Sequence, residues 1–387
     1  MTLDTQSSHA AVKSDTPDVV AVGDGFFGVE GDWSLLAGKL DGCSFFLGPE
    51  WLSAWWETYG QPRQPLVFRI GSKNNPIAAV PLSLGRRRFN GLTVREIGWI
   101  GTGERVCPEH LDALGDSGKG TVVAIAKWLQ QNKNVWDMVR LLDSRAGGFA
   151  SFLVERLGDA GFIAKTLPCC RCPRIVLPPV YEDLIAGYSY NMRRTVRRID
   201  RRLQKDSGYR VEWFNAEKGC SGQDIEDALD EMNRLHTLSR SAHSEQGNFI
   251  DETYRAFHAR LMARTLDSGI LRLAFLYHSD SEQPIAFRYG FLYNNIWIDY
   301  QTGYDTAYRK QRIGWYLLGE CLRRAIAEGA AIFDMLRGDH DYKRHWATAC
   351  EETETIWVFN NNLRGRLMRL ALYVKPVIRK LLTLHKS

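Results

Sequence analysis

Side chains that could move a proton or oppose a negative charge gather in a short stretch near the end of the chain. Asp334 ends an apolar segment, and His340 and Lys343 follow it. Acyl transfer needs the nucleophile to lose a proton and the developing oxyanion to be stabilised. We predict that Lys343 stabilises charge on the acyl oxygen or holds a donor phosphate. Asp334 or His340 would then orient or deprotonate the acceptor.

The elements before this stretch would position it. Residues 283–293 and 297–303 are rich in aromatic and β-branched residues, and Asn294-Asn295 between them predicts a hairpin. A helical pattern follows from Trp315 and closes at Gly329, a residue suited to a left-handed cap. Residues 330–336 read as a short apolar strand.

A basic, glycine-containing loop leads into this predicted helix. The first N–H groups of a helix lack partners and lie at its positive end, so the start of the helix favours an anion. The loop is therefore the predicted site for the phosphates of a donor, and its residues are Arg309, Lys310, Gln311, Arg312, Ile313 and Gly314.

Hairpin, loop, helix and strand in this order resemble the core of the GNAT acyltransferase superfamily. Segments 303–305, 333–338 and 342–346, with Gly314, resemble the BioF2-like (CelD-type) acetyltransferases of envelope and exopolysaccharide loci, which are related to the FemABX peptidyltransferases. By this resemblance, Asp334 matches the Asp of an Asp-x-x-x-Gly segment and Lys343 the Lys of an aromatic-Lys segment. Acetyl-CoA or another acyl-CoA would then be the donor.

One residue of the loop departs from the superfamily pattern. The chain has Gly314-Trp-Tyr316, whereas the superfamily places a small residue last. A tyrosine there would crowd a close approach of the backbone to pyrophosphate. The donor therefore stays open between acyl-CoA and the aminoacyl-tRNA that FemABX proteins use.

Two pairs of similar segments predict an internal duplication. Residues 75–80 resemble 283–288, and residues 135–140 resemble 332–337. We predict an α/β protein of two tandem GNAT-like units, each a mixed, mostly antiparallel sheet flanked by helices. The predicted divisions are a disordered tail at 1–22, units at 23–175 and 176–362, and a basic amphipathic helix at 363–387.

The first unit lacks a basic loop comparable to that of the second unit. We therefore expect it to have a structural role or to contact the acceptor. Its aromatic residues Trp51, Trp55 and Tyr59 recur on one helical face and are predicted to pack in the core.

Residues 191–203 form an expected helix with two contrasting faces. Arginines cover about half of its circumference, and an apolar stripe lies opposite. The arginines would either bind a phosphorylated partner or pair internally with carboxylates that include Asp200 and Asp206. The residues predicted to contact substrate are Arg194, Arg198, Tyr304 and Tyr342.

Composition narrows the class of protein and its compartment. The chain has 387 residues, 44% of them hydrophobic, and a net charge of +5, so it can bury a large core and is not a general nucleic-acid binder. Nucleic acid other than tRNA is not expected as a partner. No long apolar run or secretory signal is present, which predicts a cytoplasmic protein. The cysteines of segment 169–172 lack a second ligand pair, so no metal is predicted.

The last segment, 363–387, mixes apolar and basic residues and contains no acidic one. This pattern favours either an interfacial helix on the anionic inner face of the plasma membrane or a helix docked on the protein itself. We expect an acyltransferase that transfers an N- or O-acyl group to a small-molecule or lipid-linked sugar acceptor, a precursor of envelope or exopolysaccharide. The alternatives are an aminoacyl-tRNA-dependent peptidyltransferase and a non-catalytic scaffold of a polysaccharide synthesis complex.

Overall fold

The computed structural model describes residues 44–370 except 73–74, 90, 104–105, 117, 215–220, 242–247 and 339, together with 18–19, 33 and 37. Within these residues the strands form one continuous sheet in the order β1-β2-β3-β4-β6-β13-β7-β12-β11-β10-β9-β8, and β5 pairs with β3. The predicted tail at 1–22 lies outside the described residues apart from β1 (Asp18–Val19).

The first unit places helices around an antiparallel sheet with one parallel pair. After β1, its elements are η2 (Phe45–Leu47), α2 (Pro49–Tyr59), β2 (Gln64–Ser72), β3 (Asn75–Phe89), β4 (Leu92–Trp99), β5 (Leu114–Gly115), α3 (Lys119–Gln131), β6 (Met138–Arg145), α4 (Phe149–Asp159) and β7 (Ile163–Val176). Ser44 caps η2, and Pro49 opens α2 at a position where its missing N–H costs nothing.

The second unit begins with two helices and repeats the same strand plan. Its elements are α5 (Tyr181–Ala186), α6 (Tyr190–Lys205), β8 (Tyr209–Phe214), α7 (Gly222–Ser241), η4 (Asn248–Ile250), α8 (Glu252–Asp267), β9 (Leu271–His278), β10 (Ala286–Tyr293), β11 (Ile296–Tyr304), η5 (Thr306–Gln311), α9 (Ile313–Ala327), β12 (Ile332–Asp334), α10 (Asp341–Trp346) and β13 (Ala349–Phe359). The predicted hairpin is confirmed as β10 and β11, with Asn294 and Asn295 at φ 47 and 58°.

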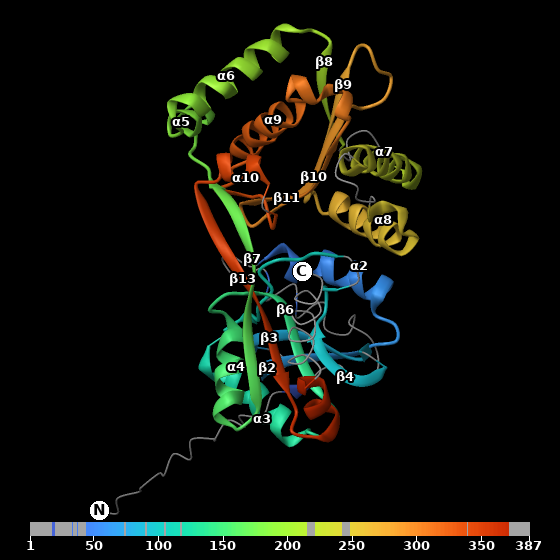
Figure 1. Ribbon diagram of the computed structural model, residues 1–387, viewed down its shortest axis with the longest axis vertical. Helices are drawn as coiled ribbons and strands as arrows, with labels where there is room; N and C mark the ends of the chain where they lie inside the picture. The colour runs from blue at the N-terminus through green and yellow to red at the C-terminus, as the bar shows by residue number, and fades with distance from the viewer. Residues whose placement is uncertain are drawn as a thin grey trace, which may run out of the picture.

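The two units share one topology, which confirms the predicted fold class. β2, β3 and β4 run antiparallel, and β4 pairs parallel with β6 after the intervening helix α3. In the same way β9, β10 and β11 run antiparallel, and β11 pairs parallel with β12 after α9. Figure 1 shows α6 and α9 on one side of the second sheet and α7 and α8 on the other.

The long strands β7 and β13 join the units. β13 pairs with both β6 and β7, and the end of β7 pairs with β12, so these strands run from one lobe into the other (Figure 1). The division predicted between residues 175 and 176 therefore falls inside a strand of the shared sheet. The domain bounds stay a prediction.

Aromatic side chains pack α2 and η2 of the first unit against the second unit. Phe45 stacks on Phe291 with ring centroids 4.1 Å apart, and Trp51 packs edge-on against Phe257 of α8. Trp51 and Trp55 are buried and Tyr59 is partly buried in the same cluster, which confirms their predicted role in packing. None of the described helices is long and apolar enough to cross a membrane.

Candidate active site

The start of α9 is an open helix end beside a basic loop. Arg312 has φ 58° and sets the entry to α9, whose first hydrogen bonds run from the N–H groups of Trp315 and Tyr316 to the Arg312 carbonyl, at 3.0 and 3.3 Å. The N–H groups of Ile313 and Gly314 precede this turn, and such groups have no partner inside a helix. A Cβ on Gly314 would meet nothing within 4 Å, so open space adjoins the backbone here.

Exposed cations surround this helix end. Arg309 and Lys310 are exposed on η5, and Arg312 is exposed above the ring of Trp315. From α6, Arg202 donates a hydrogen bond to the Gln311 carbonyl. The loop and the C-terminal end of α6 thus form one positive surface, which suits a phosphorylated ligand.

Tyr316 does not crowd the open face of the loop. Its side chain is only 8% exposed and packs in the hydrophobic cluster between α9, α6 and the sheet. The space next to Gly314 stays open. The expected conflict between a tyrosine at this position and a close phosphate therefore does not arise from the position of its ring.

Strands β11 and β12 part near the predicted catalytic stretch. They pair only from Ile296 to Ile298 and from Ile332 to Asp334, whereas β11 continues to Tyr304. The register of β10 with β11 shifts at Tyr289 and Gly290, which leaves Tyr300 as an extra residue in β11. Bulges of this kind often re-aim side chains next to active sites.

Lys343 fixes the end of β12. Its Nζ donates hydrogen bonds to the carbonyl oxygens of Met335 at 2.6 Å and Leu336 at 3.3 Å, and to that of Arg337. Burial lowers the pKa of Lys343, although Asp299 of β11 and Asp334 of β12 both favour its charged form. The ammonium therefore lies among charges from both sides of the gap between the strands.

Gly338, which lines a cavity, lies close to this ammonium. A Cβ at Gly338, whose φ is 121°, would lie 3.2 Å from Lys343 Nζ and 3.2 Å from His340 Cδ2. His340 itself is exposed, and its ring stacks on Tyr342 with centroids 6.1 Å apart. An amine and an imidazole thus flank a position that has no side chain.

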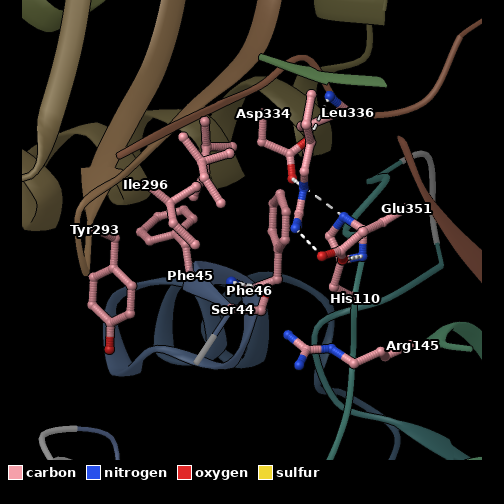
Figure 2. A pocket seen from close by; sticks show the side chains of 13 residues that line it. Ser44, Phe45, Phe46, His110, Arg145, Tyr293, Ile296, Asp334, Leu336 and Glu351 are labelled. Carbon is pink, nitrogen blue, oxygen red and sulfur yellow. Dashed lines mark hydrogen bonds and ion pairs between the residues drawn. The ribbon is translucent and has the colours of Figure 1, made fainter. Parts of the chain in front are cut away.

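Asp334 lines a cavity of about 190 Å³ (Figure 2). Its Oδ2 accepts from Arg174 Nε at 2.7 Å and is 3.3 Å from His110 Nε2, and its Oδ1 accepts from the Leu336 N–H at 2.8 Å. Burial alone would raise its pKa, but His110 and Arg174 lower it. His110 Nδ1 also lies 3.4 Å from Glu351.

A family comparison matches most of the second unit. Residues 190–344 match the family described as "Acetyltransferase (GNAT) domain". This match supports a GNAT-type fold for the segment, which is called the GNAT-type domain below. No curated protein matches the chain. Membership of the BioF2-like subfamily stays a prediction.

Solved structures share the fold of the whole chain. FemX has a TM-score of 0.60 at 10% identity and covers 88% of this chain and 98% of its own. The C-terminal domain of a putative lysylphosphatidylglycerol synthetase from Agrobacterium fabrum scores 0.51 at 10% identity, with 89% and 96% covered. A conserved protein of unknown function from Bacteroides thetaiotaomicron scores 0.54 at 12% identity, with 88% and 99% covered. At these identities the likeness concerns the fold.

The predicted basic helix is confirmed as α6 of the GNAT-type domain. The alternative that its arginines pair with Asp200 and Asp206 is not confirmed. Asp200 pairs with Arg323 of α9 at 2.5 Å, and Asp206 lies 3.9 Å from His278. Arg194 and Arg198 are exposed, and no described carboxylate lies within ion-pair distance of either. This part of the cationic face is therefore open to solvent.

The predicted site residues fall into three groups. Asp334 and Lys343 meet at the end of β12, with Tyr342 of α10 and His340 at the N-cap of α10 nearby. The loop residues 309–314 gather at the start of α9. Tyr304 ends β11 and packs against the cluster under α9, and Arg194 and Arg198 lie on α6 away from the β12 group.

Sequence reasoning missed the first unit's polar contribution. Glu109 and His110 lie in an irregular segment, and Arg337 of the GNAT-type domain binds Glu109 and also contacts Asp143 at 2.5 Å. Burial raises the pKa of Glu109 to about 7, against the opposing charge of Arg337. Burial is the main reason that this carboxyl group retains a proton, and the nearby charges of Asp143 and Asp334 add to the effect. The only feature of the sequence that pointed to Glu109 and His110 was that the two residues are adjacent in the chain.

Among the described residues, no group of three or more His, Cys, Asp or Glu side chains could hold a metal ion. The Sγ atoms of Cys169 and Cys170 are 3.3 Å apart on β7, and Cys172 is buried on the same strand. All three are free thiols of a sheet strand, as expected for a segment that connects the units.

Proposed function

We propose that the protein is an acyltransferase that uses a phosphorylated acyl carrier, with acyl-CoA as the donor. The observation that carries the proposal is the start of α9, where a Cβ on Gly314 would meet nothing within 4 Å and where Arg309, Lys310 and Arg312 are exposed. Backbone donors, helix dipole and basic side chains together suit the pyrophosphate of such a carrier. The GNAT-type match over residues 190–344 supports the same assignment.

The acyl group would lie in the gap between β11 and β12, beside Lys343. The acceptor's amine or hydroxyl would attack the acyl carbon, His340 would take its proton, and the bond to the donor's sulfur would break. The proton then passes to the leaving thiolate. Lys343 would oppose the negative charge that develops on the acyl oxygen, since its ammonium lies near the open position at Gly338.

Asp334 is better suited to positioning than to proton transfer. It is fixed by Arg174 and by the Leu336 N–H, and its lowered pKa makes it a weak base. It would hold the end of β12, and through it the carbonyl groups that Lys343 binds. His110 of the first unit and Glu351 of β13 would serve the same purpose.

A FemX-like use of aminoacyl-tRNA is the second candidate, and the open face of α6 favours it. Arg194 and Arg198 lie on the 16-residue helix whose other end contacts the loop at Gln311, so the positive surface is longer than one diphosphate requires. Titration of the protein with acetyl-CoA and with aminoacyl-tRNA separates the two candidates. Binding of neither would contradict both and leave the scaffold hypothesis.

We also propose that the acceptor is a sugar precursor of envelope or exopolysaccharide, and that the protein attaches to an anionic membrane through residues 363–387. Residues 363–370 are helical, and Met368 and Gly365 face the protein while Leu363, Leu367 and Leu370 are exposed. Arginines 364, 366 and 369 alternate with these leucines, and the whole segment lacks acidic residues. An apolar edge with flanking cations suits an anionic lipid surface. Residues 371–387 lie outside the described part of the chain.

A further inference from the structure

A second cavity, of about 630 Å³, lies where β7, the segment after β12 and α10 meet. Its volume is in the range of small-molecule sites. None of the lining residues that the structure describes is acidic, and three are arginines from three different segments: Arg171, Arg337 and Arg344. The walls between them are apolar or thiol groups from Pro173, Ala347, Cys169, Cys170 and Cys350.

This cavity and the one around Asp334 lie on opposite sides of the same strands. Arg174 of β7 and Glu351 of β13 line the smaller cavity, whereas their neighbours Pro173 and Cys350 line the larger one. Successive side chains of a strand point to opposite faces, which explains this division. Asp334 and Glu351 thus line the smaller cavity, whereas the charged residues in the described lining of the larger one are arginines.

Two of the three arginines are strongly exposed. Arg171 is 77% exposed and lies 3.9 Å from an exposed Glu352. Arg344 is 54% exposed and pairs with Asp341, itself 83% exposed, one turn earlier on α10. An exposed ion pair contributes little to stability, so an oxyanion of a ligand can compete with these carboxylates for both guanidinium groups. Arg337 is anchored by Glu109 and Asp143 and forms a fixed wall.

The thiol of Cys169 does not cancel the charge of these arginines. Burial, the neighbouring Cys170 and Asp143 raise the pKa of Cys169 to about 12, so this thiol stays neutral at physiological pH. At its inner end the cavity reaches Gly338, the position flanked by Lys343 and His340. A ligand held by the arginines would therefore extend toward the groups assigned to the transfer.

We infer that this cavity binds the acceptor through a phosphate or carboxylate group, which the guanidinium groups of Arg171 and Arg344 hold while the nucleophile points to Gly338. Planar guanidinium groups pair with both kinds of oxyanion in a two-pronged manner. This assignment rests on the proposed acyl transfer for the identity of the ligand as an acceptor. The anion site itself rests on the lining residues alone.

Calorimetric titration without any donor tests the site. The probes are glucose 6-phosphate, glucuronate and glucose, against wild type and the double variant Arg171→Gln/Arg344→Gln. We expect at least one of the two anionic sugars to bind, glucose not to bind, and the double variant to bind the anionic sugar at least tenfold more weakly. The phosphate and carboxylate arms tell which oxyanion the site prefers.

The matched control removes two exposed arginines elsewhere, with Arg86→Gln/Arg88→Gln on β3. This variant should bind as wild type does. Equal affinities in wild type and the Arg171→Gln/Arg344→Gln variant, or no binding of either anionic sugar to wild type, would overturn the inference. If the anionic sugars bind as expected but no acyl donor binds in a separate titration, the acyl-transfer proposal fails and the anion site stands.

Discussion

At the scale of residues, the account depends on a lysine and a histidine that flank a glycine. Lys343 is buried and bound to three main-chain carbonyl groups, so its removal would disturb both the fold of the segment and the chemistry. His340 is exposed and can be changed with less effect on folding. The histidine therefore offers the cleaner test of mechanism.

We predict that His340→Gln lowers kcat about 100-fold, the usual contribution of a general base, while the melting temperature stays near that of wild type. The measurement is the steady-state rate with the donor and acceptor found by titration. His345→Gln, an exposed histidine on the same helix, is the control. A rate for His340→Gln within a factor of three of wild type would remove this residue from the mechanism.

Glu109 gives a prediction about pH. Its pKa is raised from 4.5 to about 7, a difference that corresponds to about 3 kcal/mol. The folded protein holds this proton more tightly than the unfolded chain, so the contribution is fully present below pH 4.5 and is lost as pH rises to 7. We predict that Glu109→Gln is more stable than wild type at pH 8 and similar at pH 4.5.

Urea unfolding at several pH values measures this difference. The free energy of unfolding of the variant minus that of wild type should increase between pH 4.5 and 8. A difference that does not change with pH would show that Glu109 is ionised throughout, held by Arg337.

The sequence located some of these residues but not all. Asp334 and Lys343 were predicted from motifs near one strand end, because chain neighbours stay neighbours in the fold. Glu109, His110 and Glu351 come from segments far away in sequence. Only the pairing of β13 with β7 brings Glu351 to Arg174, and no local pattern encodes that contact.

At the scale of elements, the hairpin, the basic loop and the helix after it followed from local signals. The Asn294-Asn295 turn and Gly329 adopt the positive φ angles that their types favour. The pairing of β13 with the first unit could not be predicted in this way. It depends on which open sheet edges lie within reach once both units have formed.

The prediction at the scale of elements concerns the arginines of helix α6. If the donor is an aminoacyl-tRNA, Arg194→Gln/Arg198→Gln should weaken tRNA binding about tenfold or more and reduce its dependence on salt, because two phosphate contacts are lost. If acyl-CoA is the donor, its Kd should hardly change, since these arginines lie away from the loop. The assay is binding of each ligand at two salt concentrations, with Arg86→Gln/Arg88→Gln as the control. An unchanged tRNA affinity would exclude α6 as a tRNA surface.

At the scale of the whole molecule, one sheet passes through both units and makes the first unit part of the site. Arg174 of β7 holds Asp334 of β12, and Arg337 reaches back to Glu109. The duplication predicted from two short pairs of segments is confirmed by the shared topology. The closeness of the two units was beyond prediction, because it arises from buried aromatic contacts such as Phe45 on Phe291.

Attachment to membranes is the prediction that concerns the molecule as a whole. Wild type should sediment with vesicles of phosphatidylglycerol and phosphatidylcholine and not with phosphatidylcholine alone. Leu367→Glu should abolish most of this binding, because it places a negative charge at the exposed apolar edge. Phe152→Glu, at another exposed apolar residue on α4, should bind as wild type does. Equal loss in both variants, or binding without anionic lipid, would contradict the assignment.

The most direct test of the account is calorimetric titration of acetyl-CoA into wild type, Gly314→Ala and Gly120→Ala. A Cβ at either glycine meets nothing within 4 Å, and Gly120 lies in the first turn of α3, the equivalent helix of the first unit. Both variants should therefore fold, but only the methyl group at Gly314 would stand where the phosphates approach the backbone. The account predicts saturable binding to wild type and Gly120→Ala and at least tenfold weaker binding to Gly314→Ala. Absence of binding to wild type, or equal affinity in all three proteins, would contradict it.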